Sequence, residues 1–115
     1  CWLPMAATHV PLAVDQQEED PGSLLNHYRA LLAWRKGMDV LWTGEMVMLP
    51  ADDRVLAFER GGGEERVICA FNLSPETAEL VLPHGVREIV RSPMIGARIE
   101  VDRLELAPWS GAILR

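Results

Sequence analysis

Residues 20–36 read DPGSLLNHYRALLAWRK, and this stretch carries the only long helical pattern in the chain. One side of the predicted helix is mostly apolar, because the following residues recur at helical spacing: Leu24, Tyr28, Leu31, Leu32 and Arg35. Leu25 and Trp34 widen this apolar side. A helix of this character needs a substantial surface to pack against, and we expect much of that surface to lie outside the chain.

The two ends of the predicted helix have their own signals. Asp20 is expected to be the N-cap, because its carboxylate can accept a hydrogen bond from a free backbone N–H of the first turn. Pro21 then occupies the first helical position, where no N–H is needed. Arg35 and Lys36 suit the negative end of the helix dipole, and Gly37 can adopt the left-handed conformation that ends a helix. These signals predict a helix over residues 21–37.

After Gly37 the pattern changes from helical to alternating, which is typical of strands. The predicted strands are Glu45–Leu49, Arg54–Arg60, Arg66–Asn72, Thr77–Leu82, Arg87–Arg91, Arg98–Val101, Leu104–Leu106 and Ala112–Leu114. Residues 66–72 are nearly all apolar and therefore predict a central strand covered on both faces. Residues 61–64 predict a hairpin loop. About eight short strands with turns between them predict a mainly β fold, an antiparallel β-sandwich or Greek key preceded by one long α-helix.

Length and composition limit the alternatives. The chain has 115 residues, which is at most one domain, and a formal net charge of -6. Nucleic acid is therefore not an expected partner, because phosphate binding needs a basic patch. A membrane is not expected either, since no apolar run approaches the roughly 20 residues of a spanning helix. No signal peptide is visible, and the start at Cys1 suggests a processed product or a piece of something longer.

Cys1 and Cys69 are far apart in sequence and lack the spacing of a metal site. We interpret both as free thiols of a reducing compartment, which predicts a cytoplasmic location. Residues 1–19 have no clean period and are broken by proline, so this segment is predicted to be irregular and to lie on another surface.

The blocks of the first third of the chain resemble a known pattern. They are Trp2-Leu3-Pro4, Gln17, Asp20-Pro21, Ser23-Leu24-Leu25, Tyr28-Arg29, Leu31-Leu32 and Arg35-Lys36. They resemble the region after the catalytic barrel motifs in bacterial α-glucosidases and oligo-1,6-glucosidases of the α-amylase superfamily, glycoside hydrolase family 13. The strand blocks Val55–Arg60, Val67–Ser74 and Pro108–Leu114 resemble strands of the small β-sandwich, domain C, that follows it.

This resemblance implies a division of the chain. Residues 1–20 would belong to the loop region of the barrel, residues 21–37 would be the last barrel helix, and residues 38–115 would be domain C. The implied partners are the (β/α)8 catalytic barrel of the parent chain and α-glucosides as the parent's substrate. The implied chemistry is retaining hydrolysis by two carboxylates about 5 Å apart. Their motifs do not occur here, so no catalytic residue is assigned.

Other reactive side chains are interpreted structurally. The acidic cluster Asp15, Glu18, Glu19 and Asp20 is read as helix capping and a solvated face, because the calcium-loop pattern is absent. His9, His27 and His84 are scattered without metal-ligand spacing. Cys69 lies among apolar neighbours and is expected to be a buried, inert thiol. We therefore predict no cofactor and no metal.

The four tryptophans are the remaining candidates, because aromatic rings can stack on sugars or pack in cores. Trp34 and Trp109 are expected in the core or at an interface. Trp2 and Trp42 are the candidates for sugar contact.

Two functions from different classes follow. The first is a non-catalytic C-terminal region that stabilises the catalytic barrel of an α-glucosidase-like hydrolase. The alternative is a free-standing carbohydrate-binding β-sandwich module without catalysis. A free-standing module should have no uncovered apolar helix face, which separates the two.

Overall fold

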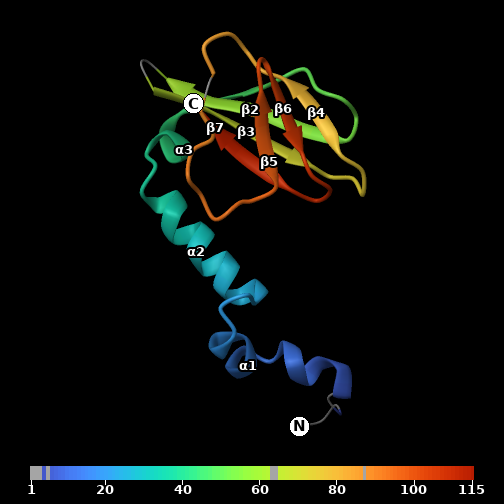
Figure 1. Ribbon diagram of the computed structural model, residues 1–115. Coiled ribbons are helices and arrows are strands. Elements are labelled where there is room, and N and C mark those ends of the chain that lie inside the picture. Colours follow the sequence, from blue (N-terminus) through green and yellow to red (C-terminus); the bar gives the residue numbers. More distant parts are fainter. Residues whose placement is uncertain (1–3, 5, 63–64, 87) are drawn as a thin grey trace.

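The computed structural model describes residue 4 and residues 6–62, 65–86 and 88–115. The helices are η1 (Ala7–Leu12, a 3-10 helix), α1 (Val14–Glu19), α2 (Leu24–Lys36) and α3 (Val40–Thr43). The strands are β1 (Glu45–Met48), β2 (Val55–Gly62), β3 (Glu65–Asn72), β4 (Ala78–Val81), β5 (Ala97–Glu100), β6 (Arg103–Leu106) and β7 (Gly111–Leu114). Figure 1 shows the strands gathered in one body and the first helices leading away from it. The predicted β-sandwich preceded by a long helix is confirmed.

The described strands form two antiparallel sheets. One has four strands in the order β1-β2-β3-β7, and the other has three in the order β4-β6-β5. The chain crosses from the first sheet to the second after β3 and returns after β6. Within the first sheet, Cys69 of β3 lies between Phe58 of β2 and Ile113 of β7. Strand β3 is therefore interior, as its apolar sequence predicts.

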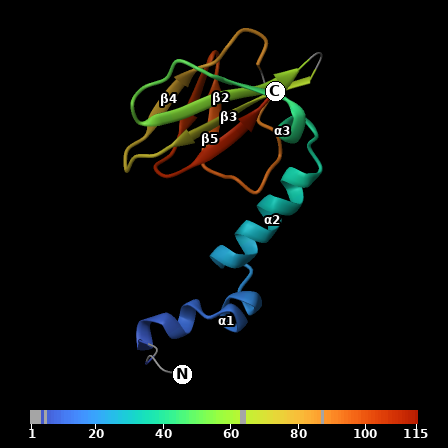
Figure 2. The ribbon, with the colours of Figure 1, turned by 180° about the vertical axis from the view of Figure 1, so that it is seen from behind.

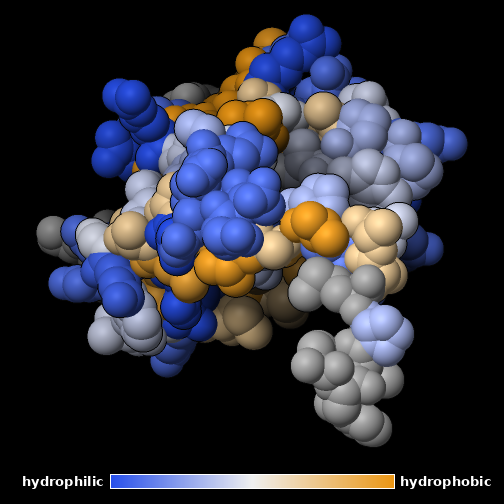
Figure 3. Space-filling model, turned by 90° about the horizontal axis from the view of Figure 1, so that it is seen from below, coloured by the Kyte–Doolittle hydropathy of each residue, from blue (hydrophilic) through white to orange (hydrophobic). Residues whose placement is uncertain are grey.

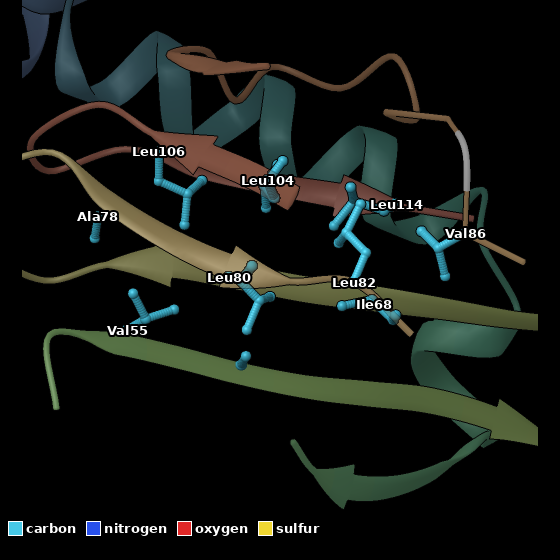
Figure 4. Packing of buried hydrophobic residues seen from close by; sticks show 12 residues of the cluster. Val55, Ile68, Ala78, Leu80, Leu82, Val86, Leu104, Leu106 and Leu114 are labelled. Atoms are coloured by element: carbon cyan, nitrogen blue, oxygen red, sulfur yellow. The ribbon is translucent and has the colours of Figure 1, made fainter. Parts of the chain in front are cut away.

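The main core lies between the two sheets (Figure 4). Its largest side chains are almost completely inaccessible: Ile68, Leu104, Leu106 and Leu114 are 0–1% exposed. They come from strands of both sheets and therefore hold the sheets together. Burial of each such side chain contributes about 1.5–3 kcal/mol.

A second cluster covers the other face of β3. Val67 and Cys69 alternate with Ile68 along the strand and pack with Val40 and Leu41 of α3. Both faces of β3 are therefore covered, one by the second sheet and one by α3. The residues of α3 were not predicted to be helical, because a four-residue helix has no recognisable period.

The side chain of Asn72, at the end of β3, is 1% exposed and joins three parts of the sandwich. Its Nδ2 donates to the carbonyl oxygens of Glu76, Leu106 and Ala107 at 2.6, 3.3 and 2.9 Å. Its Oδ1 accepts from the N–H and the hydroxyl of Ser74. The amide thus satisfies backbone groups of the loop after β3 and of the end of β6 in a site without water access.

Helix α2 begins later than predicted. Its N-cap is Ser23, whose Oγ accepts from the N–H of Asn26 at 3.2 Å. The carboxylate of Asp20 is instead used in a turn, where it accepts from the N–H of Gly22 at 2.8 Å. Pro21 therefore lies before the helix, and the prediction that it is the first helical residue is wrong. A serine hydroxyl competes well with an aspartate carboxylate for this position, and the sequence analysis considered Asp20 alone.

The end of α2 also differs in detail. Gly37 lies at the predicted position but has φ -84°, so the prediction of a left-handed residue there is wrong. Its N–H bonds to the carbonyl of Trp34, which tightens the last turn. The chain can then continue directly into α3 without reversing.

Two further predictions need correction. The N-terminal segment predicted as irregular contains η1 and α1, which are too short for a periodic signal. The strand predicted at residues 87–91 is shorter than predicted: Ile89 forms a bridge with Leu114, and Glu88 and Val90 bond to the backbone of Arg115 and Ile113. Residue 87 itself is outside the described residues. Pro93 follows closely and cannot donate to a ladder, so pairing does not extend. The predicted hairpin loop falls partly on residues 63 and 64, which are also outside the described part.

Val101, between β5 and β6, has φ 58°, a conformation that is unfavourable for a β-branched residue. The side chain is 89% exposed and therefore gains little from packing. We expect Val101→Gly to raise the free energy of unfolding by about 1 kcal/mol, since glycine adopts this conformation without strain. Urea denaturation followed by tryptophan fluorescence measures this change, and a lower unfolding midpoint in the variant would contradict it.

Candidate functional site

Helix α2 stands out because several of its large apolar side chains are exposed to solvent. None of its 13 residues, all of them described, is buried. Leu24, Tyr28 and Leu32 are 69%, 57% and 50% exposed and lie about one turn apart on one side of the helix. We call these three residues the apolar stripe. Figure 3, seen from the N-terminal end, shows hydrophobic side chains open at the surface between hydrophilic ones.

The shape of the molecule follows from this arrangement. Both views of the ribbon show α2 projecting from the sandwich, with η1 and α1 at its far end (Figures 1 and 2). The radius of gyration is 17.1 Å, whereas a compact domain of this length has about 13 Å. We call residues 7–36 the arm. More apolar side chains of the arm are exposed at its far end: Val10, Leu12 and Val14.

The arm is held together by polar contacts where α1 meets α2. The Oγ of Ser23 donates to the carbonyl of Gln17 at 2.6 Å. The side-chain amide of Asn26 donates to the carbonyls of Gln17, Glu18 and Asp20. These bonds satisfy the carbonyls at the end of α1, which an isolated short helix would leave without partners. The arm is therefore built to keep its shape although it has almost no core.

Tryptophan side chains fix the other end of α2 to the sandwich. The indole N–H of Trp34 donates to the carbonyl of Arg91 at 2.9 Å, and that of Trp42 donates to the carbonyl of Arg35 at 3.1 Å. The guanidinium of Arg35 also lies 4.5 Å from the centre of the Trp42 ring, a cation–π contact. These contacts set the direction in which α2 leaves the sandwich.

Gly44 brings the backbone after α3 into close contact with β2. A Cβ at this position would lie 2.6 Å from the carbonyl of Val40 and 2.9 Å from the N of Gly61 in β2. Only glycine allows the chain to pass so close to β2. Gly44 is the residue that connects the end of α3 to the start of β1.

An open apolar groove of about 260 Å³ lies between α2 and the outer face of the four-stranded sheet. Its lining is mostly apolar and includes Leu31, Trp34, Met46, Phe58, Phe71 and Met94. The neighbouring side chains of β1, the edge strand, are more than half exposed: Met46, Val47 and Met48. Leu31, which lines the groove, lies one helical turn after Tyr28 of the apolar stripe, so the stripe and the groove adjoin along α2. Exposed apolar side chains gathered in this way are typical of a surface that contacts another protein.

Of the two residues predicted to contact sugar, only Trp42 lies within the described part of the chain. Trp2 lies outside the described residues. Trp42 is 52% exposed, but Arg35 covers one face of its ring and its indole N–H is already bonded. It therefore offers one ring face at most, and its contact with a sugar stays a prediction.

Trp34 and Trp109 were both predicted to lie in a core or interface. Trp34 is half-buried against the cluster of Val67, Cys69 and Ile113. Trp109 is 69% exposed, so of the two predicted places the core of this chain is wrong, and a place at an interface stays a prediction. It occupies a tight turn after Pro108 and has φ 53°. The sequence Pro108-Trp109 indicated a turn, but nothing in the sequence indicated that the Trp109 side chain is exposed.

Two acidic side chains of the described residues, Glu18 and Asp52, form exposed ion pairs with arginine. No group of three or more His, Cys, Asp or Glu side chains among them could hold a metal ion. Glu18 of the acidic cluster pairs with Arg29 at 2.7 Å, as expected of a solvated helix face. Hydrogen bonds from Arg54 lower the pKa of Asp52 to about 2. This contact lies in an exposed turn.

No described helix has the length and apolar character needed to cross a membrane.

Cys69 is 3% exposed, and burial raises the pKa of its thiol to about 11. The reactive thiolate forms only as the pH rises through that value, so almost none is present at pH 8. We expect Cys69 in the folded protein to react with iodoacetamide at least about 100-fold more slowly than a free cysteine. Mass spectrometry of the Cys69 peptide measures this rate. Labelling at the rate found in urea would contradict the prediction of an inert thiol.

Comparison with known proteins relates this architecture to a group of enzymes. The model of the family described as maltogenic amylase, C-terminal domain, matches residues 46–113. A probable alpha-glucosidase of Rhizobium meliloti (strain 1021) is 37% identical over 114 residues. The match covers 99% of this chain and 21% of that protein.

Two further relatives give the same result. An oligo-1,6-glucosidase of Parageobacillus thermoglucosidasius is 25% identical over 120 residues, covering 99% of this chain and 21% of that protein. The crystal structure of an alpha-glucosyl transfer enzyme, XgtA, matches with a TM-score of 0.86 and 38% identity, covering 99% of this chain and 22% of that one. The chain thus spans about a fifth of the length of the relatives it matches.

Proposed function

Because this chain belongs to the maltogenic amylase C-terminal domain family, we propose that its role is to cover and stabilise the catalytic barrel of an α-glucosidase-like hydrolase. It is a C-terminal domain of the α-glucosidase and α-amylase group of enzymes. The parent enzyme acts on α-linked glucosyl oligosaccharides, and the barrel carries the catalytic carboxylates.

The observation that carries this proposal is the apolar stripe. A 13-residue helix is marginal in water by itself, and most helical stability in proteins comes from packing of an apolar face. Leu24, Tyr28 and Leu32 have no such packing within the described residues, although the groove beside them is apolar as well. A second body that fills the angle between α2 and the sandwich supplies the missing surface.

The proposed organisation assigns each part a place. Residues 21–37 contain the last barrel-type helix, α2. Residues 38–115 form domain C and include α3 and all seven strands of the described structure. Residues 1–20 belong to the loop region of the barrel, where η1 and α1 lie against its rim. The joint around Trp42 and Gly44 keeps the barrel helix and domain C at a fixed angle.

Assays with sugar test this division of roles. We expect the 115-residue chain to release no glucose from maltose, and millimolar maltose to leave its tryptophan fluorescence unchanged. Quenching by maltose would support the free-standing carbohydrate-binding module instead. Hydrolysis of maltose by the chain itself would overturn both functions, because the chain contains none of the barrel's carboxylate motifs.

A further inference from the structure

We infer that the loop end of the sandwich, formed by Leu73, Ile95 and Trp109, is a second contact surface for the same catalytic domain, with Trp109 as its anchor. This inference rests on the proposed function. The inference goes beyond the proposed function in one respect: the catalytic domain contacts two surfaces of this chain, the apolar stripe and the loop end.

The three side chains come from three loops that are bonded to one another. The N–H of Trp109 donates to the carbonyl of Ser74, next to Leu73, at 3.1 Å. The hydroxyl of Ser110 donates to the carbonyl of Gly96, next to Ile95, at 3.0 Å. Ile95, Trp109 and Leu73 are 83%, 69% and 60% exposed. Three large apolar side chains are thus exposed on one fixed group of loops, which is unusual for a surface that faces only water.

Trp109 is held in a conformation that does not favour tryptophan. It follows Pro108 in a tight turn and has φ 53°, a position at which glycine or asparagine is the preferred residue. Its ring is mostly exposed, so packing within the chain does not offset the strain. Strained residues cluster at functional positions, and tryptophan is enriched among the residues that carry most of the binding energy of protein interfaces. Val101 is strained and exposed as well, so it is the aromatic ring that distinguishes Trp109.

The loop end continues the surface already assigned to the catalytic domain. Met94, next to Ile95, lines the groove beside α2. The bond from Trp34 to the carbonyl of Arg91 holds the same segment against α2. In Figure 1 this segment, which precedes β5, runs on the side of the sandwich from which α2 projects. One partner that fills this angle can therefore touch the stripe, the groove and the loop end together.

A protein fits this surface better than a sugar does. The neighbours of Trp109 at the loop end are the aliphatic side chains Leu73 and Ile95, which offer no hydrogen bonds to hydroxyl groups. The hydroxyl of Ser110, the residue after Trp109, is already engaged with the carbonyls of Gly96 and Ala107. Aromatic and aliphatic residues without free polar groups are typical of the core of a protein interface.

Val81 and Val101 provide an internal reference. They are 62% and 89% exposed, and the bond from the N–H of Leu82 to the carbonyl of Asp102 places their loops side by side. They lie at the opposite ends of β4 and β5 from the loop end. The proposed catalytic domain does not reach them.

Hydroxyl-radical footprinting of the native protein from its source tests the inference, with each residue's rate compared with its rate in urea. We expect Trp109 and Ile95 to be slowed at least about fivefold and Val81 and Val101 less than about twofold, because interface cores exclude water. If Leu24 and Tyr28 are protected but the rate of Trp109, relative to its rate in urea, is lowered no more than that of Val101, the inference is overturned and the proposed function stands. Absence of protection at both surfaces would overturn both.

A variant separates contact from backbone strain. Trp109→Asn keeps a residue that tolerates positive φ, so the sandwich should fold normally. We expect it to lower the melting temperature of the native enzyme by about 3 °C, whereas the control Val101→Gly raises it. A melting temperature that rises for both variants would contradict the inference. Slower footprinting of Trp109 only when maltose is present would also contradict it and would indicate a sugar site.

Discussion

Replacement of Leu24, Tyr28 and Leu32 together by serine is expected to destabilise the proposed parent enzyme by about 6 kcal/mol, because each buried side chain of this size contributes about 1.5–3 kcal/mol. In the native enzyme the three side chains would be covered by the catalytic domain. In this chain they are at least half exposed, so their removal changes little within the sandwich itself. Heat inactivation of α-glucosidase activity measures the effect on the enzyme.

The control for this variant lies on the opposite side of the same helix. Ala30 and Ala33 are exposed and do not belong to the apolar stripe. Their replacement by serine lowers helix propensity similarly per residue but removes little apolar surface. Equal inactivation temperatures for the triple variant and this control would mean that nothing covers the stripe.

The second large effect is expected from Asn72→Ala, which should lower the free energy of unfolding of the sandwich by about 4 kcal/mol, since each buried polar group left unpaired costs about 1–3 kcal/mol. The substitution leaves the carbonyls of Leu106 and Ala107 without this donor and the N–H of Ser74 without its acceptor. Urea denaturation monitored by tryptophan fluorescence gives this value directly.

Asn26 provides the matched control for Asn72. Its side-chain amide also donates to three backbone carbonyls, but it is only half-buried and water can replace it. We expect Asn26→Ala to cost about 1 kcal/mol. If the two variants unfold at the same urea concentration, burial of the Asn72 network is not what makes it important.

Features with a local cause could be predicted from the sequence. Helical spacing identified α2, and alternation together with glycine- and proline-containing turns identified the seven strands of the described structure. The central position of β3 followed from its continuous apolar run. The family resemblance, carried mainly by residues 20–36, is confirmed by the matches to α-glucosidases and to the maltogenic amylase C-terminal domain.

Features that depend on distant contacts could not be predicted. Ser23 and Asp20 are both good N-caps, and the choice between them depends on contacts between α1 and α2. The exposure of Trp109 depends on how three separate loops meet. The role of Asn72 beyond ending a strand depends on carbonyls more than 30 residues away. The residue boundaries of domain C, the cytoplasmic location and sugar contact by Trp2 and Trp42 stay predictions.

The native mass of the protein from its source, compared with its denatured mass, tests most directly whether a catalytic barrel covers the stripe. We predict a particle far larger than the 12.8 kDa of this chain, in which its sequence is joined to or associated with a barrel-sized body. A soluble monomer of 12.8 kDa would contradict the account. The apolar stripe would then have to be covered within the chain itself, as in a free-standing module.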